Sequence, residues 1–146
     1  MKLVLPYPVS ANRYWGKRAY IDRETHKPMA IVYVTDEAKS YKSQCAWIAK
    51  VAGFKQPTER PVEITSITLC PRMNKDGSAS GTVLDLGNCW KVLEDALQGV
   101  VYVNDRQIKR IRNVEYGEPT AHGAIEIEIE EFVPAPAPLF AHAAAA

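Results

Sequence analysis

Two aspartates and a lysine in the middle of the chain have the types and spacing of a hydrolytic metal site. Asp85 precedes a helical pattern, Lys91 lies a turn inside it, and Asp105 follows it. Mg²⁺ takes oxygen ligands and is often held by one or two carboxylates together with water and substrate phosphate. A nearby lysine would stabilise the charge that develops on a phosphate during attack. Asp85 and Asp105 are therefore the predicted metal ligands, and with Lys91 they form the predicted catalytic set.

The residues between the two aspartates predict a helix, a short strand and a turn. Apolar side chains recur there at helical spacing, at Cys89, Val92, Leu93, Ala96 and Leu97. Gly99 fits the position that ends a helix, and the β-branched and aromatic run 100–103 predicts a strand. Spacing alone favours a plainer interpretation, in which Asp85 only caps the helix, Lys91 is solvated and Asp105 belongs to a turn.

The same stretch resembles the core motif of the RusA family of Holliday-junction resolvases. That motif reads D-L-D-N, then a lysine four residues after the second aspartate, then D-A-L, and later an acidic pair before Q-[IV]. The matching residues are Asp85, Leu86, Asn88, Lys91, Asp95-Ala96-Leu97, and Asn104-Asp105 before Gln107-Ile108. The resemblance implies a catalytic set of three aspartates and the lysine. Here Gly87 stands in place of the second aspartate.

The resemblance extends over roughly residues 3–131. Residues 5–14, L-P-Y-P-V-S-A-N-R-Y, resemble the family's opening L-P-[WY]-P-P-S-x-N-x-[YH], and 34–41 resemble its entry into the first helix. The family implies a homodimer whose two active sites nick opposite strands of a four-way DNA junction, with Mg²⁺ or Mn²⁺, in DNA recombination and repair. Small resolvases of this type are often carried by prophages, so a bacterial or prophage origin is expected.

Gly87 supports two opposite inferences. Loss of a carboxylate weakens metal binding, which leaves open a junction-binding protein with weak or no catalysis. A glycine near a helix N-terminus also exposes backbone N–H groups and lets a phosphate approach closely. Asp76, in the loop 71–82, is a candidate replacement for the missing carboxylate. A small domain unrelated to the family is a third alternative.

The periodicity elsewhere predicts a single small α+β domain, a mixed β-sheet with two helices, over residues 1–132. Strands are expected at 2–7, 62–69 and 123–132, a long-looped hairpin at 18–23 and 29–34, and a second helix at 35–52. Thr35 is its predicted N-cap and Gly53 its stop. Val62, Ile64 and Ser66 are expected on one face of their strand. Residues 133–146 form a low-complexity tail.

Composition narrows the class of protein. A chain of 146 residues with 47% hydrophobic composition suits one domain with its own core. No apolar run approaches the roughly 20 residues of a membrane span, and the N-terminus lacks a signal-peptide core, so we expect a cytoplasmic protein. Cys45, Cys70 and Cys89 are odd in number and form no Cys-x-x-Cys. They are expected to be reduced core thiols.

The net charge of +1 conceals an asymmetry that favours a polyanionic partner. Residues 1–112 hold all 18 Lys and Arg against 11 acids, and 113–146 hold six Glu. The candidate DNA-binding residues are Arg13, Lys17, Arg18, Arg72, Lys75, Asn88, Arg106, Lys109 and Arg110. Each also fits a solvated surface. The cluster 106–112 fits a basic edge strand that discourages aggregation, and Glu126, Glu128 and Glu130 fit an exposed ladder that keeps the protein soluble.

Overall fold

A five-stranded mixed sheet forms the centre of the computed structural model, which describes residues 1–135. Its strands are β1 (Lys2–Pro6), β4 (Val62–Cys70), β5 (Ile108–Ile111), β6 (Val114–Tyr116) and β7 (Ala124–Glu131). The order is β1-β7-β4-β5, with β6 also beside β4. β7 runs antiparallel to β1 and β4, whereas β5 and β6 run parallel to β4. The predicted α+β fold with a mixed sheet is confirmed.

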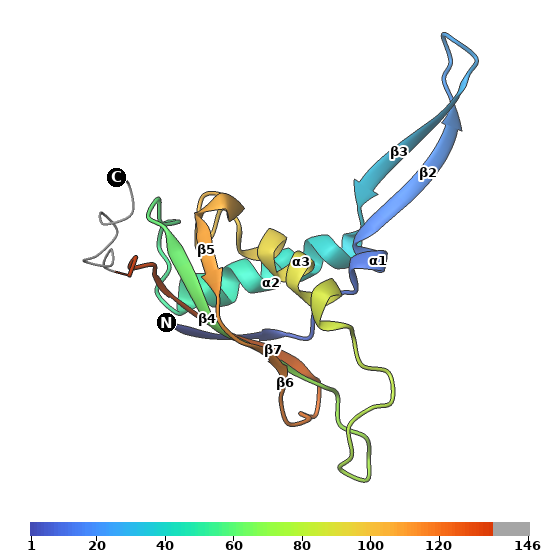
Figure 1. The fold of residues 1–146 in the computed structure, drawn as a ribbon. Coiled ribbons are helices and arrows are strands. Elements are labelled where there is room, and N and C mark those ends of the chain that lie inside the picture. Colours follow the sequence, from blue (N-terminus) through green and yellow to red (C-terminus); the bar gives the residue numbers. More distant parts are fainter. Residues whose placement is uncertain (136–146) are drawn as a thin grey trace, which may run out of the picture.

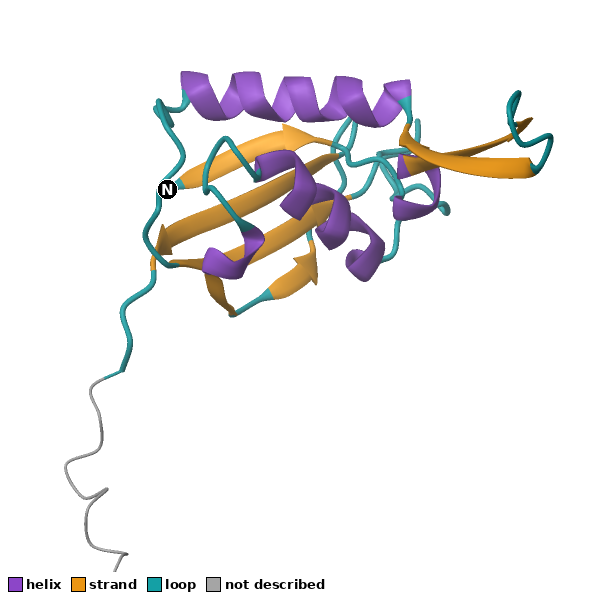
Figure 2. Ribbon diagram, turned by 90° about the horizontal axis from the view of Figure 1, so that it is seen from above, coloured by secondary structure: helices purple, strands orange, loops and turns teal. Residues whose placement is uncertain are grey.

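Two long helices, α2 (Asp36–Val51) and α3 (Leu86–Leu97), pack over one face of the sheet (Figures 1 and 2). Their predicted caps are confirmed. Thr35 accepts a hydrogen bond from the Ala38 N–H, and Gly53 and Gly99 follow the helix ends with positive φ. A one-turn helix α1 (Ala11–Tyr14) and a 3-10 turn (Asp105–Gln107) complete the elements. None of the helices within residues 1–135 has the length and apolar character needed to cross a membrane.

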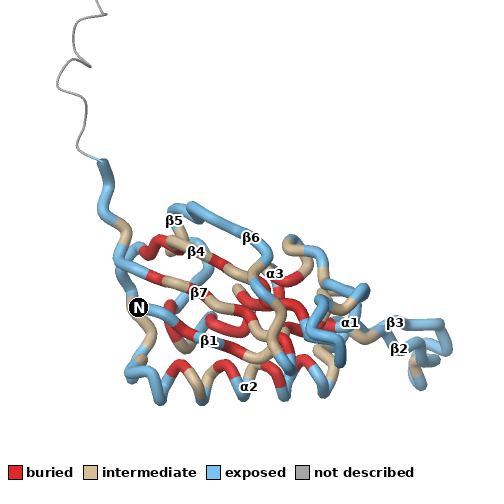
Figure 3. Tube along the Cα trace, turned by 90° about the horizontal axis from the view of Figure 1, so that it is seen from below, coloured by how far each residue is buried: buried red, intermediate tan, exposed pale blue. Residues whose placement is uncertain are grey.

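The core lies between the helices and the sheet (Figure 3). Ile125, Ile127 and Ile129 of β7 point into it, because alternate residues of a strand face opposite sides. All three cysteines are free and buried, as predicted. Burial raises the pKa of Cys45 and of Cys89 to about 11. Both thiols are therefore protonated at neutral pH.

A two-stranded arm made of β2 (Trp15–Ile21) and β3 (Pro28–Val34) projects away from the rest of the molecule (Figure 1). The predicted hairpin is confirmed, but its first strand begins earlier than expected. Lys17 therefore lies on the strand together with Arg18. The arm is exposed along its length, with Ile21 at 68% and Val32 at 57% exposure.

The prediction of a strand at 100–103 is wrong. The chain turns there instead, and Tyr102 makes only isolated bridges with Thr58 and Gln98. The Gly99 N–H donates to the Tyr102 carbonyl at 2.7 Å, which closes the turn. The Tyr102 ring is fully buried and its hydroxyl donates to the Glu94 carbonyl at 2.9 Å. Burial of this ring overrides the local β propensity.

The prediction that Val62, Ile64 and Ser66 lie on one face of β4 is wrong for Ser66, because the strand contains a bulge. The register with β7 shifts between Ile64 and Ser66. A bulge adds one residue to a strand and reverses the alternation beyond it. Ile67 and Leu69 therefore join Val62 and Ile64 in the core, and Ser66 does not.

Candidate active site

Asp85 is the N-cap of α3, so the plain structural role predicted for it is present. Its Oδ1 accepts hydrogen bonds from the Gly87 N–H at 2.8 Å and the Asn88 N–H at 3.2 Å. The residue is exposed and joins no ion pair within residues 1–135. The cap uses Oδ1 alone, which leaves Oδ2 available to a ligand. A capping role and a metal-binding role are therefore compatible in one side chain.

Lys91 lies on the exposed face of α3, four residues after Gly87 and three before Glu94. Side chains three and four residues apart project from the same side of a helix. Neither Lys91 nor Glu94 takes part in an ion pair in the described part of the chain. The ammonium group is thus free to meet an anion that approaches this face.

Asp105 is held at the start of the 3-10 turn by a reciprocal cap. Asn104 Oδ1 accepts from the Arg106 N–H at 2.9 Å, and Gln107 Oε1 accepts from the Asn104 N–H at 2.7 Å. The Gln107 amide nitrogen also donates to the carbonyls of Thr58 at 2.7 Å and Arg60 at 2.9 Å. Gln107 therefore fixes the turn that presents Asp105, which gives the glutamine of the motif a physical role.

Glu94 is a further acidic residue beside Asp105 that the sequence reasoning did not single out. The Tyr102 hydroxyl ties the chain before Asp105 to the Glu94 carbonyl. Burial raises the pKa of the Glu94 carboxyl, the nearby Asp105 carboxylate raises it further, and Lys91 opposes the shift. Asp105 and Lys91 therefore lie close enough to Glu94 for their charges to shift its pKa. The sequence holds no signal for this, because Glu94 occupies an ordinary helical position and only the fold brings Asp105 near it.

Asp85 lies at the opposite end of this surface. Nine residues separate it from Glu94, which corresponds to about 13 Å along a helix axis. Within residues 1–135, no three His, Cys, Asp or Glu side chains are grouped so that they could hold a metal ion. The oxygen donors present still suit Mg²⁺, which often takes one or two carboxylates and keeps several waters. The predicted sharing of one ion by Asp85 and Asp105 stays a prediction.

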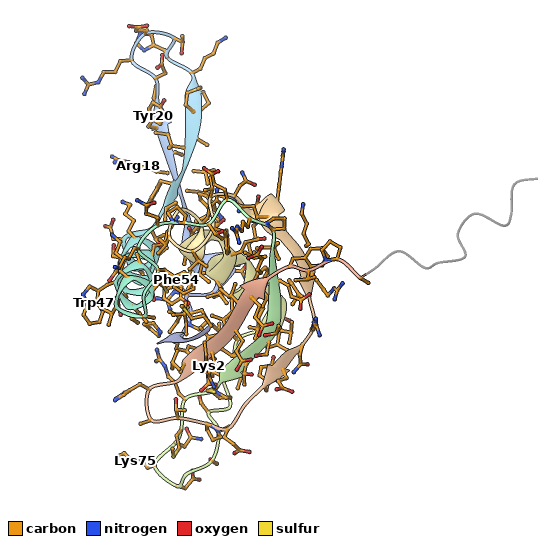
Figure 4. The ribbon with its side chains drawn as sticks, turned by 90° about the vertical axis from the view of Figure 1, so that its left-hand side faces the viewer. Lys2, Arg18, Tyr20, Trp47, Phe54 and Lys75 are labelled. Carbon is orange, nitrogen blue, oxygen red and sulfur yellow. The ribbon has the colours of Figure 1, made fainter. Side chains whose placement is uncertain are left out.

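Asp76 does not emerge as the replacement carboxylate. Its Oδ1 accepts hydrogen bonds from the Ser78 N–H at 3.0 Å and the Ser78 hydroxyl at 2.6 Å. Figure 4 shows the adjacent Lys75 at the outer end of this loop, away from the body of the protein. Asp76 thus stabilises a turn in the loop and joins none of the carboxylates described above.

The predicted DNA-binding residues fall into separate groups. Arg13 and Arg72 line one hollow beside the chain that leads to Asp85. Lys17 and Arg18 lie on the arm, where Figure 4 shows Arg18, and Asn88 lies in the first turn of α3. Arg106 and Lys109 are exposed next to Asp105, and Lys109 Nζ donates to the Arg106 carbonyl at 2.9 Å.

Arg110 is engaged elsewhere. Its guanidinium lies 3.2 Å from the buried carboxylate of Glu63 and 5.1 Å from the centre of the Phe132 ring. Arg112 also pairs with Glu63, at 2.5 Å. The carboxylate thus draws both guanidinium groups towards it. Arg110 has a structural partner, and its predicted contact with DNA stays a prediction.

A family model described as Endodeoxyribonuclease RusA matches residues 6–130. This chain belongs to the RusA endodeoxyribonuclease family. No curated protein sequence matches it. Membership implies Holliday-junction resolvase activity and binding of branched DNA, and it confirms the resemblance drawn from the motif. The match spans α3, Asp105 and the arm, so the RusA-family region takes in both the carboxylate surface and the projecting hairpin.

Proposed function

We propose that this protein is a Mg²⁺-dependent, structure-selective endodeoxyribonuclease that resolves four-way junctions during DNA recombination and repair. The observation that carries the proposal is the RusA-family match over residues 6–130, within which Asp85, Lys91 and Asp105 form no ion pair with any side chain of residues 1–135. Unpaired charges on one exposed surface suit a polyanionic substrate and a cation.

In the proposed reaction, Asp85 and Asp105 would hold the ion, and Glu94 would add negative charge beside Asp105. Mg²⁺, or Mn²⁺, would supply an activated water and neutralise charge on the phosphodiester. Lys91 donates to a non-bridging phosphate oxygen and stabilises the charge that develops there. Asn88, in the first turn of α3, is placed to donate its side-chain N–H to the neighbouring backbone.

The protein is proposed to act as a homodimer, because symmetric nicking of a two-fold junction needs two active sites related by a two-fold axis. The exposed apolar residues of the arm support an association of this kind, since large apolar patches often mark interaction surfaces. Light scattering at micromolar concentration tests it. A strictly monomeric protein that still nicks both strands in concert would contradict the dimer.

A junction-binding protein with weak or no cleavage is the second candidate. The absence of a three-ligand group within residues 1–135 favours it, as does the glycine where the family has an aspartate. Both candidates predict selective binding to a four-way junction. Only the nuclease predicts metal-dependent nicking that disappears with a chelator.

The deciding experiment compares cleavage of a labelled four-way junction and a linear duplex, with Mg²⁺, Mn²⁺ or chelator. Asp85→Asn is the informative variant, because asparagine also caps helices and so preserves α3 while removing the charge. We expect it to bind the junction normally and to cleave at least about 100-fold more slowly, since a lost metal ligand removes several kcal/mol of transition-state stabilisation. Full cleavage by this variant would refute the site.

Gly87 requires a matched pair of variants. A Cβ at this position would lie 3.1 Å from Asp85 Oδ1, so any side chain crowds the cap. Gly87→Ala adds the crowding alone, whereas Gly87→Asp adds the crowding and the carboxylate. Faster cleavage by Gly87→Asp than by Gly87→Ala shows that the missing carboxylate limits the rate. Equal rates of cleavage in both show that two aspartates suffice.

A further inference from the structure

We propose that the hollow lined by Arg13 and Arg72 is a seat for one backbone phosphate of the DNA strand that runs to Asp85. The inference rests on the proposed function, since it deepens how the same surface holds its substrate. The hollow has a volume of about 380 Å³ and lies between the start of α1, the loop after β4 and the chain before α3. Leu84, the residue before Asp85, forms part of its wall.

The chemistry of the wall suits a phosphodiester. Arg13 and Arg72 line it together with three hydroxyl-bearing residues, Ser10, Ser80 and Thr82. Arginine presents planar, forked N–H groups that match phosphate oxygens, and hydroxyls add neutral hydrogen bonds. A carbohydrate or a base would leave the positive charge of Arg72 without a counter-ion. An anion with several acceptor oxygens can accept hydrogen bonds from both guanidinium groups.

Arg72 is positioned for this task and lacks an acidic partner within residues 1–135. Its guanidinium lies 5.4 Å from the centre of the Tyr7 ring, and the Tyr7 hydroxyl accepts from the Leu84 N–H at 3.1 Å. A Cβ at Gly123, where φ is +69°, would lie 2.6 Å from Tyr7 Cδ2 and 2.9 Å from Arg72 Cγ. Gly123 thus permits a stack that links Arg72 to the chain entering the active site.

Arg13 has a partner that phosphate would replace. Its guanidinium pairs with the Glu37 carboxylate at 2.9 Å, and both side chains are well exposed. Exposed ion pairs contribute little, about 0–1 kcal/mol, so a phosphate with two or more acceptor oxygens competes readily. Glu37 also lines the hollow and repels an anion. Removing the Glu37 charge should therefore strengthen DNA binding, whereas removing the Arg72 charge should weaken it.

The first measurement is binding of a labelled four-way junction in chelator over a series of salt concentrations. Arg72→Ala should bind about tenfold more weakly, and the slope of log affinity against log salt should fall by about 1. Arg72→Lys should lie between it and the wild type, because lysine keeps the charge and loses the fork. Glu37→Gln should bind more tightly. Lys55→Ala, an exposed charge outside the hollow, is the matched control and should change affinity less than twofold.

The second measurement tests the seat without DNA, by titrating inorganic phosphate and following backbone amide signals by NMR. Shifts should concentrate at Ser10, Arg72, Ser80 and Thr82 and be lost in Arg72→Ala. The two measurements can therefore refute the phosphate seat and the proposed function independently of each other. Phosphate binding and an Arg72 effect on DNA, without junction cleavage, would leave the seat standing and the nuclease refuted. Junction cleavage with equal losses in Arg72→Ala and Lys55→Ala, or phosphate shifts spread over the surface, would overturn the seat.

Discussion

Glu63 shows what a single buried charge requires of its surroundings. It is 3% exposed and lies across from Glu130 in the sheet, yet its carboxylate meets the guanidinium groups of Arg110 and Arg112. An ionised carboxylate is tolerated inside a protein only when it is paired. Arg110 lies on β5 and Arg112 just beyond its end, so the charge also fixes this edge strand against β4.

Replacing Glu63 by glutamine should therefore destabilise the fold although the shape is nearly unchanged. We expect the free energy of unfolding in urea to fall by about 1–3 kcal/mol, because two arginines lose a charged acceptor in a partly buried setting. Arg60→Ala breaks a pair with Glu131 in which both side chains are exposed, and it should cost less than about 1 kcal/mol. Equal losses in the two variants would show that the Glu63 pairs act as ordinary surface contacts.

At the scale of elements, sequence patterns predicted the features that depend on interactions between residues close in the chain. The helical spacing from Cys89 to Leu97 and the glycine after it predicted α3, because the backbone hydrogen bonds of a helix join residues within one segment. The turn at 100–103 was missed because the buried Tyr102 ring overrides β propensity. The bulge after Ile64 and the proximity of Glu94 to Asp105 depend on other segments, so neither has a signal in nearby sequence.

The arm is an element that should be separable from the fold. Its residues contribute nothing buried between Trp15 and Tyr33, and an isolated two-stranded ribbon is marginally stable. Joining Lys17 to Val32 with an Asn-Gly turn keeps the register, because these residues are paired. We expect the melting temperature to change by less than about 2 °C while junction binding weakens by about tenfold or more, since the basic residues Arg18, Arg23 and Lys27 and the aromatic Tyr20 are removed.

Two results would contradict this prediction. Unfolding of the shortened protein would show that the arm supports the core, and unchanged junction affinity with an unchanged oligomeric state would show that it contacts neither DNA nor a second copy. Gel filtration and anisotropy on the same samples distinguish these results.

On the scale of the whole molecule, the sheet has one face covered by helices (Figure 2) and another that carries a row of glutamates. Lys91 lies on α3, on the covered side. Glu126, Glu128 and Glu130 point to the other face, because the isoleucines between them fill the core. We therefore expect DNA to approach from the α3 side, away from the row of glutamates on β7.

Charge changes of equal size on the two faces of the sheet should change the affinity for a four-way junction by different amounts. Glu128→Lys adds two positive charges behind the sheet, and Lys91→Glu adds two negative charges on α3. At 150 mM salt, where screening acts over about 8 Å, the first should alter junction affinity less than about twofold and the second should weaken it by about tenfold or more. Anisotropy measures both, with melting curves to confirm folding. Comparable and opposite changes would show that net charge alone drives binding.

The position of β7 also constrains how the chain is made. This strand pairs with β1 on one side and β4 on the other, yet it is translated last among the strands. At about 5–20 residues per second, a ribosome takes on the order of ten seconds to pass from β1 to β7. During that interval β1 lacks its neighbour, and the arm has already emerged with its apolar surface uncovered. α3, which carries the proposed site, is therefore synthesised before the strand that completes the sheet beneath it, so we expect the nascent chain to expose apolar surface until β7 has been made.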